Sequence, residues 1–429
     1  MKRYKPLLIV FIGALYFFFD SVLIVLPSGL TTPLMNKYSI TATGLSFLAA
    51  IYFYSYSLLQ LPNGILIDKF GPKKIALIGL AICAIALFIF SISDTYSSAC
   101  IARLLMGVGA SAGYLVPMIL AVKWLDKKHY VMATGCIVFI ECLGAIFGQS
   151  VVIYIFHLMG LEKTIFLLSG LSIALLVLIF LIVSDSPINT HSNASKTEEI
   201  YHTVWFSIIR IFKTTYYWII AACAALFWAP AALFASLWGI NFIVINNHVT
   251  SLVASHLLML VWIGIGIGGP FVGLLVKYFN HKLFLIVIAA IIGFFVSILI
   301  IYFSHSIFSL VIFLLILGIT CSAQVLTFGI IHDHAPKNIV ATAFGFNNMA
   351  ICFGNAIFQM VAGYLLDIFW QHTSYHGVRI YSLITYKKML LLMPACYLLI
   401  IGLTIVLKKN TLLNSISLIR LLKKATIEI

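Results

Sequence analysis

The chain has 429 residues, of which 63% are hydrophobic and 9% are charged. A soluble protein of this length carries far more charge, so the composition excludes a soluble globular fold. The net charge of +14 would suit a nucleic-acid-binding protein, but the positions of the basic residues argue against this, and we expect no nucleic-acid partner.

Long apolar segments recur along the whole chain. Crossing a bilayer takes about 20 apolar residues in a helix, and unpaired backbone cannot face lipid, so each segment is expected to be a membrane-spanning α-helix. The polar segment 185–213 divides the chain into an N-terminal bundle (1–184), a cytosolic linker and a C-terminal bundle with a tail (214–429). The predicted spans are 6–28, 43–66, 75–93, 98–123, 130–156, 163–183, 216–240, 252–276, 283–303, 306–331, 339–367 and 384–407.

The basic residues are unevenly distributed between the two sides of this topology. Pairs such as Lys73 and Lys74 fall on the side of the termini, whereas few, such as Lys37 and Lys163, fall on the other. This positive-inside bias predicts cytosolic termini. We expect a monomeric, multi-pass protein of a bacterial inner membrane. Its basic tail contacts anionic lipid, and residues near 198–213 form an amphipathic helix on the cytosolic face.

The eight cysteines are scattered along the chain, and nearly all fall inside predicted spans. They show no short paired spacing of the kind that a disulfide framework or a zinc site requires. We therefore expect no disulfide, no metal site and no cofactor.

Two halves of the chain carry matched landmarks. The segment beginning at Gly64 returns in degraded form at Gly273, 209 residues later. Duplicated halves of this kind are common in transporters, so the sequence predicts an all-α membrane protein with two bundles of six helices. A second set of residues matches at a shift of 210: Gly135, Cys142, Gly144 and Gln149 correspond to Gly345, Cys352, Gly354 and Gln359.

The short loop after the second span carries a motif of glycines, one acid and lysines. It resembles the signature loop of the major facilitator superfamily, which implies a conformational latch that stabilises an outward-open state. Asp68 could form cytosolic salt bridges with the lysines and cap neighbouring helix ends. Alternatively, the loop serves only to fix topology. The residues of the motif are Gly64, Asp68, Lys69, Gly71, Lys73 and Lys74.

The fourth span carries a second motif, Arg103-x-x-x-Gly107-x-Gly109-x-x-x-Gly113. This motif resembles the fourth-helix motif of the same superfamily. The two resemblances stand at the expected places in the twelve-span count and imply the major facilitator fold over essentially the whole chain.

The fifth span matches only half of the pattern found in antiporters of this superfamily. Gly144-x-x-x-Gly148 is followed by Gln149 where that pattern has proline, which weakens an antiporter assignment. The segments 236–239 and 345–367 resemble nutrient transporters of intracellular bacteria and their relatives, the lysosomal dipeptide transporters. This finer resemblance implies uptake of amino acids or short peptides.

Asp20 and Glu141 are the acids that lie well inside predicted spans, and Arg103 is the intramembrane arginine. Buried charges of this kind should face the bundle interior and find partners. At about 1.5 Å per residue, Asp20 lies ~21 Å, Arg103 ~22 Å and Glu141 ~16 Å from the cytosolic side. The match in depth favours Asp20 as the proton-coupling carboxylate and Arg103 as its conditional partner.

Three alternatives remain open for these residues. Asp20 and Arg103 could form a static ion pair that holds spans one and four together, or Asp20 could bind a substrate ammonium. Glu141 could be a second titrating site or a hydrogen-bonding group at a helix interface. The sequence does not distinguish protons from sodium as the coupling ion.

Neutral polar side chains recur on single faces of several spans. Such groups can hydrogen-bond a polar solute at the midplane without the cost of a buried charge, although interhelical hydrogen bonding alone also explains them individually. We predict that together they line a substrate cavity. They are Tyr52, Tyr56 and Gln60 in span two, Trp238 and Asn241 in span seven, Gln324 in span ten, and Asn348, Asn355 and Gln359 in span eleven.

The sequence therefore predicts a secondary active transporter, not an enzyme, that takes up a small polar nutrient with protons by alternating access. The alternative is proton-driven efflux of amphipathic compounds. A multi-span membrane enzyme would need clustered catalytic groups at one membrane face, and a sensor on the same scaffold would carry an added signalling domain; the sequence shows neither feature.

Overall fold

The computed structural model describes residues 5–185, 208–279, 281–336, 339–375 and 378–425. Within these ranges, 12 helical segments are long and apolar enough to cross a membrane, which confirms the predicted fold class. Of the predicted linker, residues 186–207 lie outside the described ranges, and residues 208–213 are helical. The first six spans are α1 (Lys5–Gly29), α3 (Ala42–Phe70), α4 (Pro72–Ser91), α5 with α6 (Tyr96–Ala110 and Leu115–Trp124), α7 (Lys127–Met159) and α8 (Leu161–Ile182).

The second six spans include several built from consecutive helices. A short helix, α2 (Thr31–Tyr38), follows α1, and a hairpin of β1 (Ser374–Tyr375) and β2 (Val378–Arg379) precedes the last span. The spans are α10, η2 and α11 (Thr215–Pro230, Ala231–Trp238 and Gly239–Asn247), α12 (Ser251–Phe279), α13 (Lys282–Phe303), α14 with α15 (Ile307–Ser322 and Val325–His334), α16 (Val340–Ile368), and α17 with α18 (Leu383–Leu390 and Leu392–Ala425).

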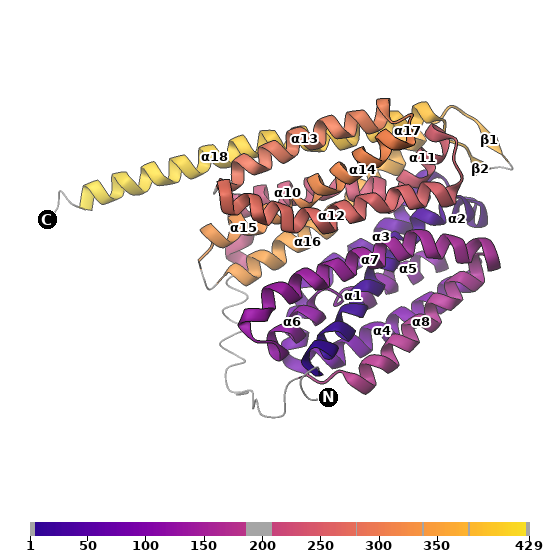
Figure 1. The fold of residues 1–429 in the computed structure, drawn as a ribbon, viewed down its shortest axis with the longest axis horizontal. Coiled ribbons are helices and arrows are strands. Elements are labelled where there is room, and N and C mark those ends of the chain that lie inside the picture. Colours follow the sequence, from indigo (N-terminus) through magenta and orange to yellow (C-terminus); the bar gives the residue numbers. More distant parts are fainter. Residues whose placement is uncertain (1–4, 186–207, 280, 337–338, 376–377, 426–429) are drawn as a thin grey trace.

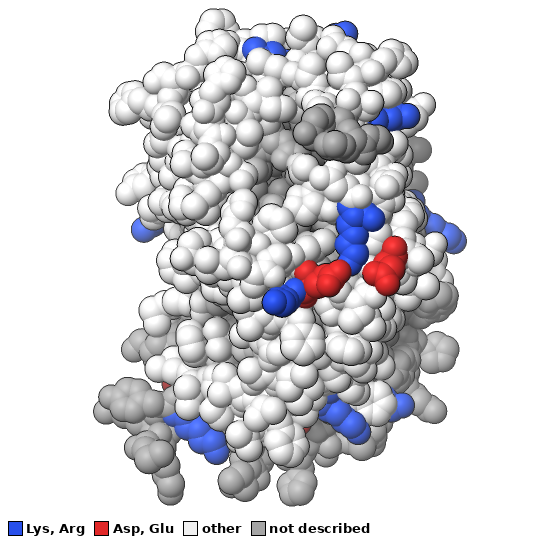
Figure 2. Space-filling view, turned by 90° about the vertical axis from the view of Figure 1, so that its right-hand side faces the viewer, with Lys and Arg blue, Asp and Glu red and all other residues white. Residues whose placement is uncertain are grey.

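The helices form two groups that lie side by side (Figure 1). Helices α1–α8 make one group and α10–α18 the other, and both chain ends lie at the same end of the molecule. We refer to that end as the terminal end. The opposite end, which carries α2, α11, α17 and the hairpin, is the far end, and Figure 2 looks directly onto it.

The two groups meet mainly where α3 packs on α16, α7 on α12 and α1 on η2, with a smaller contact between α1 and α11. The α3–α16 contact is close near both ends of the molecule. A Cβ added to Gly363 would lie 2.3 Å from Ser46 Oγ near the far end, and one added to Gly345 would lie 3.1 Å from Leu61 Cδ2 near the terminal end. In this conformation α3 and α16 therefore pack against each other along most of their length.

The fourth-span glycines allow backbone contact between helices. A Cβ on Gly107 would lie 2.1 Å from the carbonyl oxygen of Tyr52, and one on Gly109 would lie 2.6 Å from that of Gly79. Small residues permit such close approach in a membrane, where hydrophobic burial does not drive association. The motif therefore positions α5, with Arg103, directly against α3 and α4.

Candidate functional site

Asp20 lies fully buried in α1 and is held by two tyrosines of α3. The hydroxyl of Tyr52 donates a hydrogen bond to one carboxylate oxygen, and the hydroxyl of Tyr56 donates to the other at 3.2 Å. Residues four apart share a helix face, and the two rings stack with centroids 5.9 Å apart. Both tyrosines predicted to line the cavity therefore bind the predicted coupling carboxylate.

Arg103 is also fully buried and lies on the other side of Tyr52. Its guanidinium carbon is 4.7 Å from the centroid of the Tyr52 ring, which is within the range of a cation–π contact. Its Nη1 donates to the carbonyl oxygen of Leu23 at 2.9 Å, and its Nε donates to that of Leu48 at 3.4 Å. The guanidinium thus connects α5 to α1 and α3.

The depth predicted for Asp20 and Arg103 agrees with this arrangement, because both groups reach the same tyrosine. Within the described ranges, the structure contains no ion pair between them. The static ion pair that the sequence left open is therefore absent from this conformation, since the Tyr52 side chain stands between the two charges. The guanidinium Nη2 has no hydrogen-bond partner among the described residues.

Glu141 of α7 completes the group of ionisable residues near Asp20. It is partly exposed and lies close enough to Asp20 for their charges to interact. Cys352 of α16 lies within the electrostatic range of both acids. Asp20, Glu141 and Cys352 come from α1, α7 and α16, so this group lies where the two halves of the molecule meet.

The neutral residues predicted to line a cavity fall into separate places. Gln60 donates to the carbonyl oxygen of Ser111 at 3.1 Å and accepts from Asn348 at 3.2 Å, which links the two halves. Asn241 lies further towards the far end, where it accepts from Thr31 at 2.9 Å and donates to the hydroxyl of Tyr386 at 3.3 Å.

The remaining predicted cavity residues are Gln324, Asn355, Gln359 and Trp238. Gln324 lies at the break between α14 and α15, and its Oε1 is unpaired among the described residues. Gln359 donates to the backbone of η2, Trp238 is the last residue of η2, and Asn355 is buried one turn before Gln359 on α16. Part of the predicted set therefore makes interhelical hydrogen bonds in this conformation, and two of these, Gln60–Asn348 and Asn241–Thr31, cross between the halves.

The signature loop differs from its predicted geometry. Helix α4 is capped by Asp185, whose Oδ1 accepts from the Lys73 backbone N–H at 2.8 Å, and the Lys73 side chain donates to the carbonyl oxygen of Phe180 at 2.7 Å. Asp68 is exposed and has no hydrogen bond or ion pair within the described part of the chain. The cap predicted for Asp68 is therefore provided by Asp185, because the end of α8 comes closer to the first turn of α4.

The other residues of the loop have simple contacts. The ammonium groups of Lys69 and Lys74 lie 5.3 and 5.5 Å from the centroid of the Phe70 ring. Gly71 has a φ of 85°, and a Cβ there would lie 2.7 Å from the Asp185 carboxylate. Gly64 has open space around its Cα. In this conformation a side chain would fit at Gly64 but not at Gly71, where both the positive φ and the nearby Asp185 require glycine.

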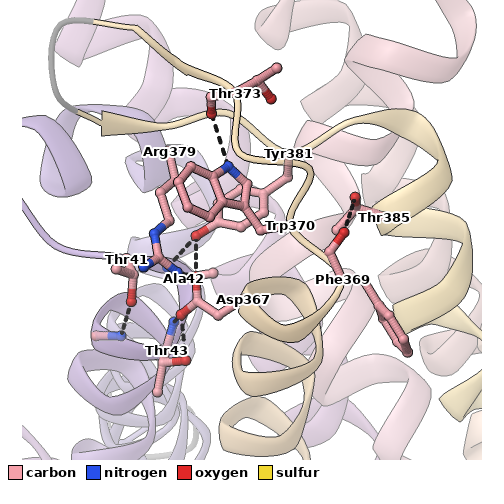
Figure 3. Close-up of polar contacts among 11 residues, drawn as sticks. Thr41, Ala42, Thr43, Asp367, Phe369, Trp370, Thr373, Arg379, Tyr381 and Thr385 are labelled. Carbon is pink, nitrogen blue, oxygen red and sulfur yellow. Dashed lines mark hydrogen bonds and ion pairs between the residues drawn. The ribbon is translucent and has the colours of Figure 1, made fainter.

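A cluster of polar contacts closes the far end between the two halves (Figure 3). Asp367, at the end of α16, accepts from the backbone N–H of Thr43 at 2.8 Å and from its hydroxyl at 2.5 Å. It also accepts from Arg379 at 3.0 Å and from Tyr381 at 2.5 Å, and the Tyr381 hydroxyl accepts from the N–H of Ala42 at 2.8 Å. We call these five residues the far-end clamp.

The clamp joins a carboxylate of the second half to the first turn of α3 in the first half. Unpaired N–H groups and the helix dipole favour a negative charge at that position. The guanidinium carbon of Arg379 lies 4.3 Å from the centroid of the Trp370 ring, which fixes the hairpin above α16. Figure 2 shows a few acidic and basic side chains close together on this face, with most of the surface around them uncharged. The cluster therefore opposes separation of the halves at the far end.

A twelve-span bundle of two matched groups, with buried charges where they meet, is the architecture of a secondary transporter. A family model described as the Major Facilitator Superfamily matches residues 9–243 and 231–407. The chain belongs to this superfamily. It is accordingly an integral membrane transporter that works by alternating access, and it is not an enzyme.

Two solved structures are similar over nearly their full length. The nucleoside transporter NupG has a TM-score of 0.72 at 14% identity and covers 94% of this chain and 99% of its own. A bacterial homologue of the human lysosomal transporter Spinster, in an inward-facing and unoccupied conformation, has a TM-score of 0.72 at 11% identity, with coverage of 95% and 98%. At these identities the likeness shows the fold alone.

Curated relatives match over shorter regions. The probable sulfoacetate transporter SauU of Cupriavidus necator is 23% identical over 163 residues, which is 38% of each chain. The quinolone resistance protein NorA of Staphylococcus aureus is 31% identical over 104 residues, or 23% of this chain and 26% of that protein. The matches therefore span well under half of these relatives, and the compounds in their names, sulfoacetate and quinolones, differ from one another.

Proposed function

We propose that the protein takes up a small polar nutrient, such as an amino acid or a short peptide, together with protons. The observation that carries this proposal is the buried carboxylate of Asp20, which is bound by Tyr52 and Tyr56 and separated from Arg103 by the Tyr52 ring. A carboxylate enclosed in this way is expensive to keep charged unless its donors stay in place.

The hydrogen bonds from Tyr52 and Tyr56 couple the protonation of Asp20 to the movement of α3. Tyr52 and Tyr56 belong to α3, which packs against α16 of the other half. When α3 shifts, the donors to Asp20 move with it, and the relative free energies of the charged and neutral carboxyl change. Proton uptake by Asp20 and the position of α3 are therefore coupled. The contact between Arg103 and the Tyr52 ring changes with the same movement of α3.

We infer that the terminal end faces the cytosol, as the distribution of lysines indicates. The far-end clamp then closes the external side in the conformation described here. Asp68 of the signature loop has no ion pair within the described residues, and it gains partners when the terminal end closes further in the opposite state. The two acids, Asp367 and Asp68, would then act in opposite states of the transport cycle.

Efflux of amphipathic compounds is the second candidate. The local likeness to a quinolone resistance protein favours it, whereas Gln149 in place of the antiporter proline disfavours it. An efflux protein of this kind would be expected to bind its substrates mainly through apolar surface, and the groups around Asp20 are polar.

The test is uptake into proteoliposomes under an inside-alkaline pH gradient, with a panel of labelled amino acids and dipeptides. Accumulation that collapses with a protonophore supports proton-coupled uptake and identifies the substrate class. Gradient-driven extrusion of lipophilic cations, with no accumulation across the panel, would overturn the proposal in favour of efflux.

A further inference from the structure

The seventh span changes its helical form at its centre. Residues Ala231–Trp238 form a π-helix, η2, between the α-helices α10 and α11. Pro230 immediately precedes it. Proline removes a backbone donor and its ring disturbs the preceding turn, so a change of register at this point has a local cause. Segments of π-helix are rare and occur preferentially at functional sites.

Two glutamines from opposite halves of the molecule bind this π-helix. Gln149 of α7 donates from its amide to the carbonyl oxygen of Ala235. Gln359 of α16 donates to the carbonyl oxygen of Ala232 at 3.1 Å. Both side chains are fully buried. They are also the pair that corresponds at a shift of 210 in the duplicated sequence, so equivalent positions of the two halves bind the same element.

The amide oxygens of both glutamines have no partner within the described ranges. Each amide has one orientation that suits its contact, because only the NH₂ group can donate to a backbone carbonyl. The oxygen must therefore point away from η2. Leaving a buried acceptor unpaired is destabilising, because the acceptor has lost its hydrogen bonds to water, and such groups in a native fold call for an explanation.

Two further unpaired atoms belong to the same region. Asn355 lies one turn before Gln359 on α16, and its Oδ1 is unpaired among the described residues; the indole N–H of Trp238, at the end of η2, is likewise unpaired there. Asn355 is 5% exposed and Trp238 is fully buried. Of these four unpaired atoms, three are carbonyl-type acceptors and one, the indole N–H of Trp238, is a donor.

We propose that these atoms form the binding site for an N–H-bearing group of the transported solute, with Gln149 and Gln359 as its two symmetry-related ligands. This inference rests on the proposed function and specifies the chemistry that the site selects. Three acceptors suit a primary ammonium, which has three donors, or an amide N–H. A carboxylate has only acceptors, so among these atoms it could accept a hydrogen bond only from the indole N–H of Trp238, and the site favours it less than an N–H-bearing group.

A solute bound at this site would contact both halves of the protein. Gln149 belongs to the first half and η2 to the second, so the Gln149–Ala235 contact crosses between them. A solute that engages both amide oxygens would bind the two halves at once. Binding energy would then depend on their relative position, which is the requirement for a ligand to shift a conformational equilibrium.

The experiment measures transport in proteoliposomes by the full-length protein and by the Gln149→Leu and Gln359→Leu variants. The labelled probes are alanine and alaninamide, which carry an ammonium, N-acetylalanine, which offers an amide N–H, and propionate, which offers no N–H group. Gln371→Leu serves as the control, because Gln371 is an exposed far-end residue. Gln149→Asn keeps the amide but shortens it, and thermal unfolding checks that each variant is folded.

We expect KM for the N–H-bearing probes to rise by about tenfold in each Leu variant, which corresponds to one lost hydrogen bond of about 1.4 kcal/mol. Gln149→Asn should lie between wild type and Gln149→Leu, and Gln371→Leu should match wild type. A preference for alanine and alaninamide identifies the ammonium as the ligand group, and equal transport of N-acetylalanine identifies the amide N–H.

The possible failures are distinguishable. Unchanged KM in both Leu variants, or transport of propionate as efficient as that of alanine, overturns the binding site and leaves proton-coupled uptake intact. Exchange of labelled alanine without gradient-driven accumulation overturns proton coupling and leaves the site intact. A wild-type protein that transports none of the N–H-bearing probes overturns both.

Discussion

The guanidinium carbon of Arg103 lies 4.7 Å from the centroid of the Tyr52 ring. The hydroxyl of the same tyrosine donates to Asp20. One side chain of α3 therefore separates the two buried charges and contacts both of them. The protonation of Asp20 should therefore depend on the position of α3. Two predictions about these residues follow from this dependence.

Asp20→Asn should abolish proton-driven accumulation and leave exchange of labelled solute intact. The amide is similar in size and keeps an oxygen that accepts from Tyr52, but it has no proton to release. The measurement compares accumulation under a pH gradient with exchange at equal pH in proteoliposomes. Glu141→Gln, tested in parallel, shows whether a second acid is required. Unimpaired accumulation by the Asp20→Asn protein would remove Asp20 from the coupling step.

Tyr52→Phe isolates the hydroxyl from the ring. The variant keeps an aromatic face against Arg103 and loses the donor to Asp20, so we expect proton-driven uptake to fall about tenfold, as for one lost buried hydrogen bond. Tyr52→Leu loses both contacts and should also lower the thermal unfolding temperature, because Arg103 then loses its cation–π contact. If Tyr52→Phe and Tyr52→Leu behave identically in uptake and in unfolding, the ring contact has no separate role.

The far-end clamp predicts an effect of Asp367→Asn on external access. The substitution removes the ion pair with Arg379 and weakens the hydrogen bonds from Thr43 and Tyr381. Since a hydrogen bond to a charged group contributes about 1.5–3 kcal/mol, the population open at the far end should rise by at least about tenfold. The readout is the labelling rate of Ser46→Cys by a membrane-impermeant maleimide, in a background without native cysteines, because Ser46 is buried where α3 meets Gly363 of α16.

A matched control is available on the same surface. Lys37 and Glu162 form an ion pair at 3.0 Å, but both belong to the first half. Glu162→Gln makes the same change of charge without touching the boundary between halves, so it should leave the labelling rate unchanged. Equal acceleration by Glu162→Gln and Asp367→Asn would show that surface charge alone controls access, and it would contradict a role for the clamp.

Tyr381 determines how the clamp depends on pH. Burial, reinforced by the hydrogen bond to Asp367, raises the pKa of the Tyr381 hydroxyl above its ordinary value of about 10. A raised pKa means that the protonated, donating form persists below the ordinary value and is lost only as pH rises through the higher one. Between about pH 6 and about pH 9, Tyr381→Phe should therefore change the labelling rate by a factor that does not vary with pH. A factor that varies across this range would contradict the assignment.

The sequence was sufficient to predict twelve spans because hydropathy reports lipid contact directly. Depth was also predictable, since a helix rises by a fixed amount per residue, and Asp20 and Arg103 do lie at the level of one tyrosine. The direction in which each side chain points around its helix axis was not predictable from depth. For this reason the sequence paired Asp20 with Arg103 and did not place Tyr52 between them.

Other contacts depend on which helix ends approach each other. Asp185 replaces Asp68 as the cap of α4 because α8 returns to that point, a proximity 112 residues apart in sequence. Asp367 stood within a segment singled out by resemblance, yet its partner Thr43 lies in the other half. The sequence identifies Gln149 as a repeated position and as the residue that replaces the antiporter proline, but not as a ligand. Its equivalence to Gln359, which was predicted to line the cavity, was the signal that could have identified it.

Gly71→Ala should lower the thermal stability of the protein more than the same change at Gly160. Both glycines have positive φ, 85° and 83°, but only at Gly71 would the new Cβ meet a neighbour, at 2.7 Å from Asp185. Backbone strain costs about 1–3 kcal/mol at either position. At Gly71 the clash also displaces the carboxylate that caps α4, which adds the cost of a lost cap, about 1 kcal/mol. Gly64→Ala, with open space around it, should be nearly neutral. Thermal unfolding in detergent measures all three, and equal shifts at Gly71 and Gly160 would show that Asp185 does not stabilise the loop.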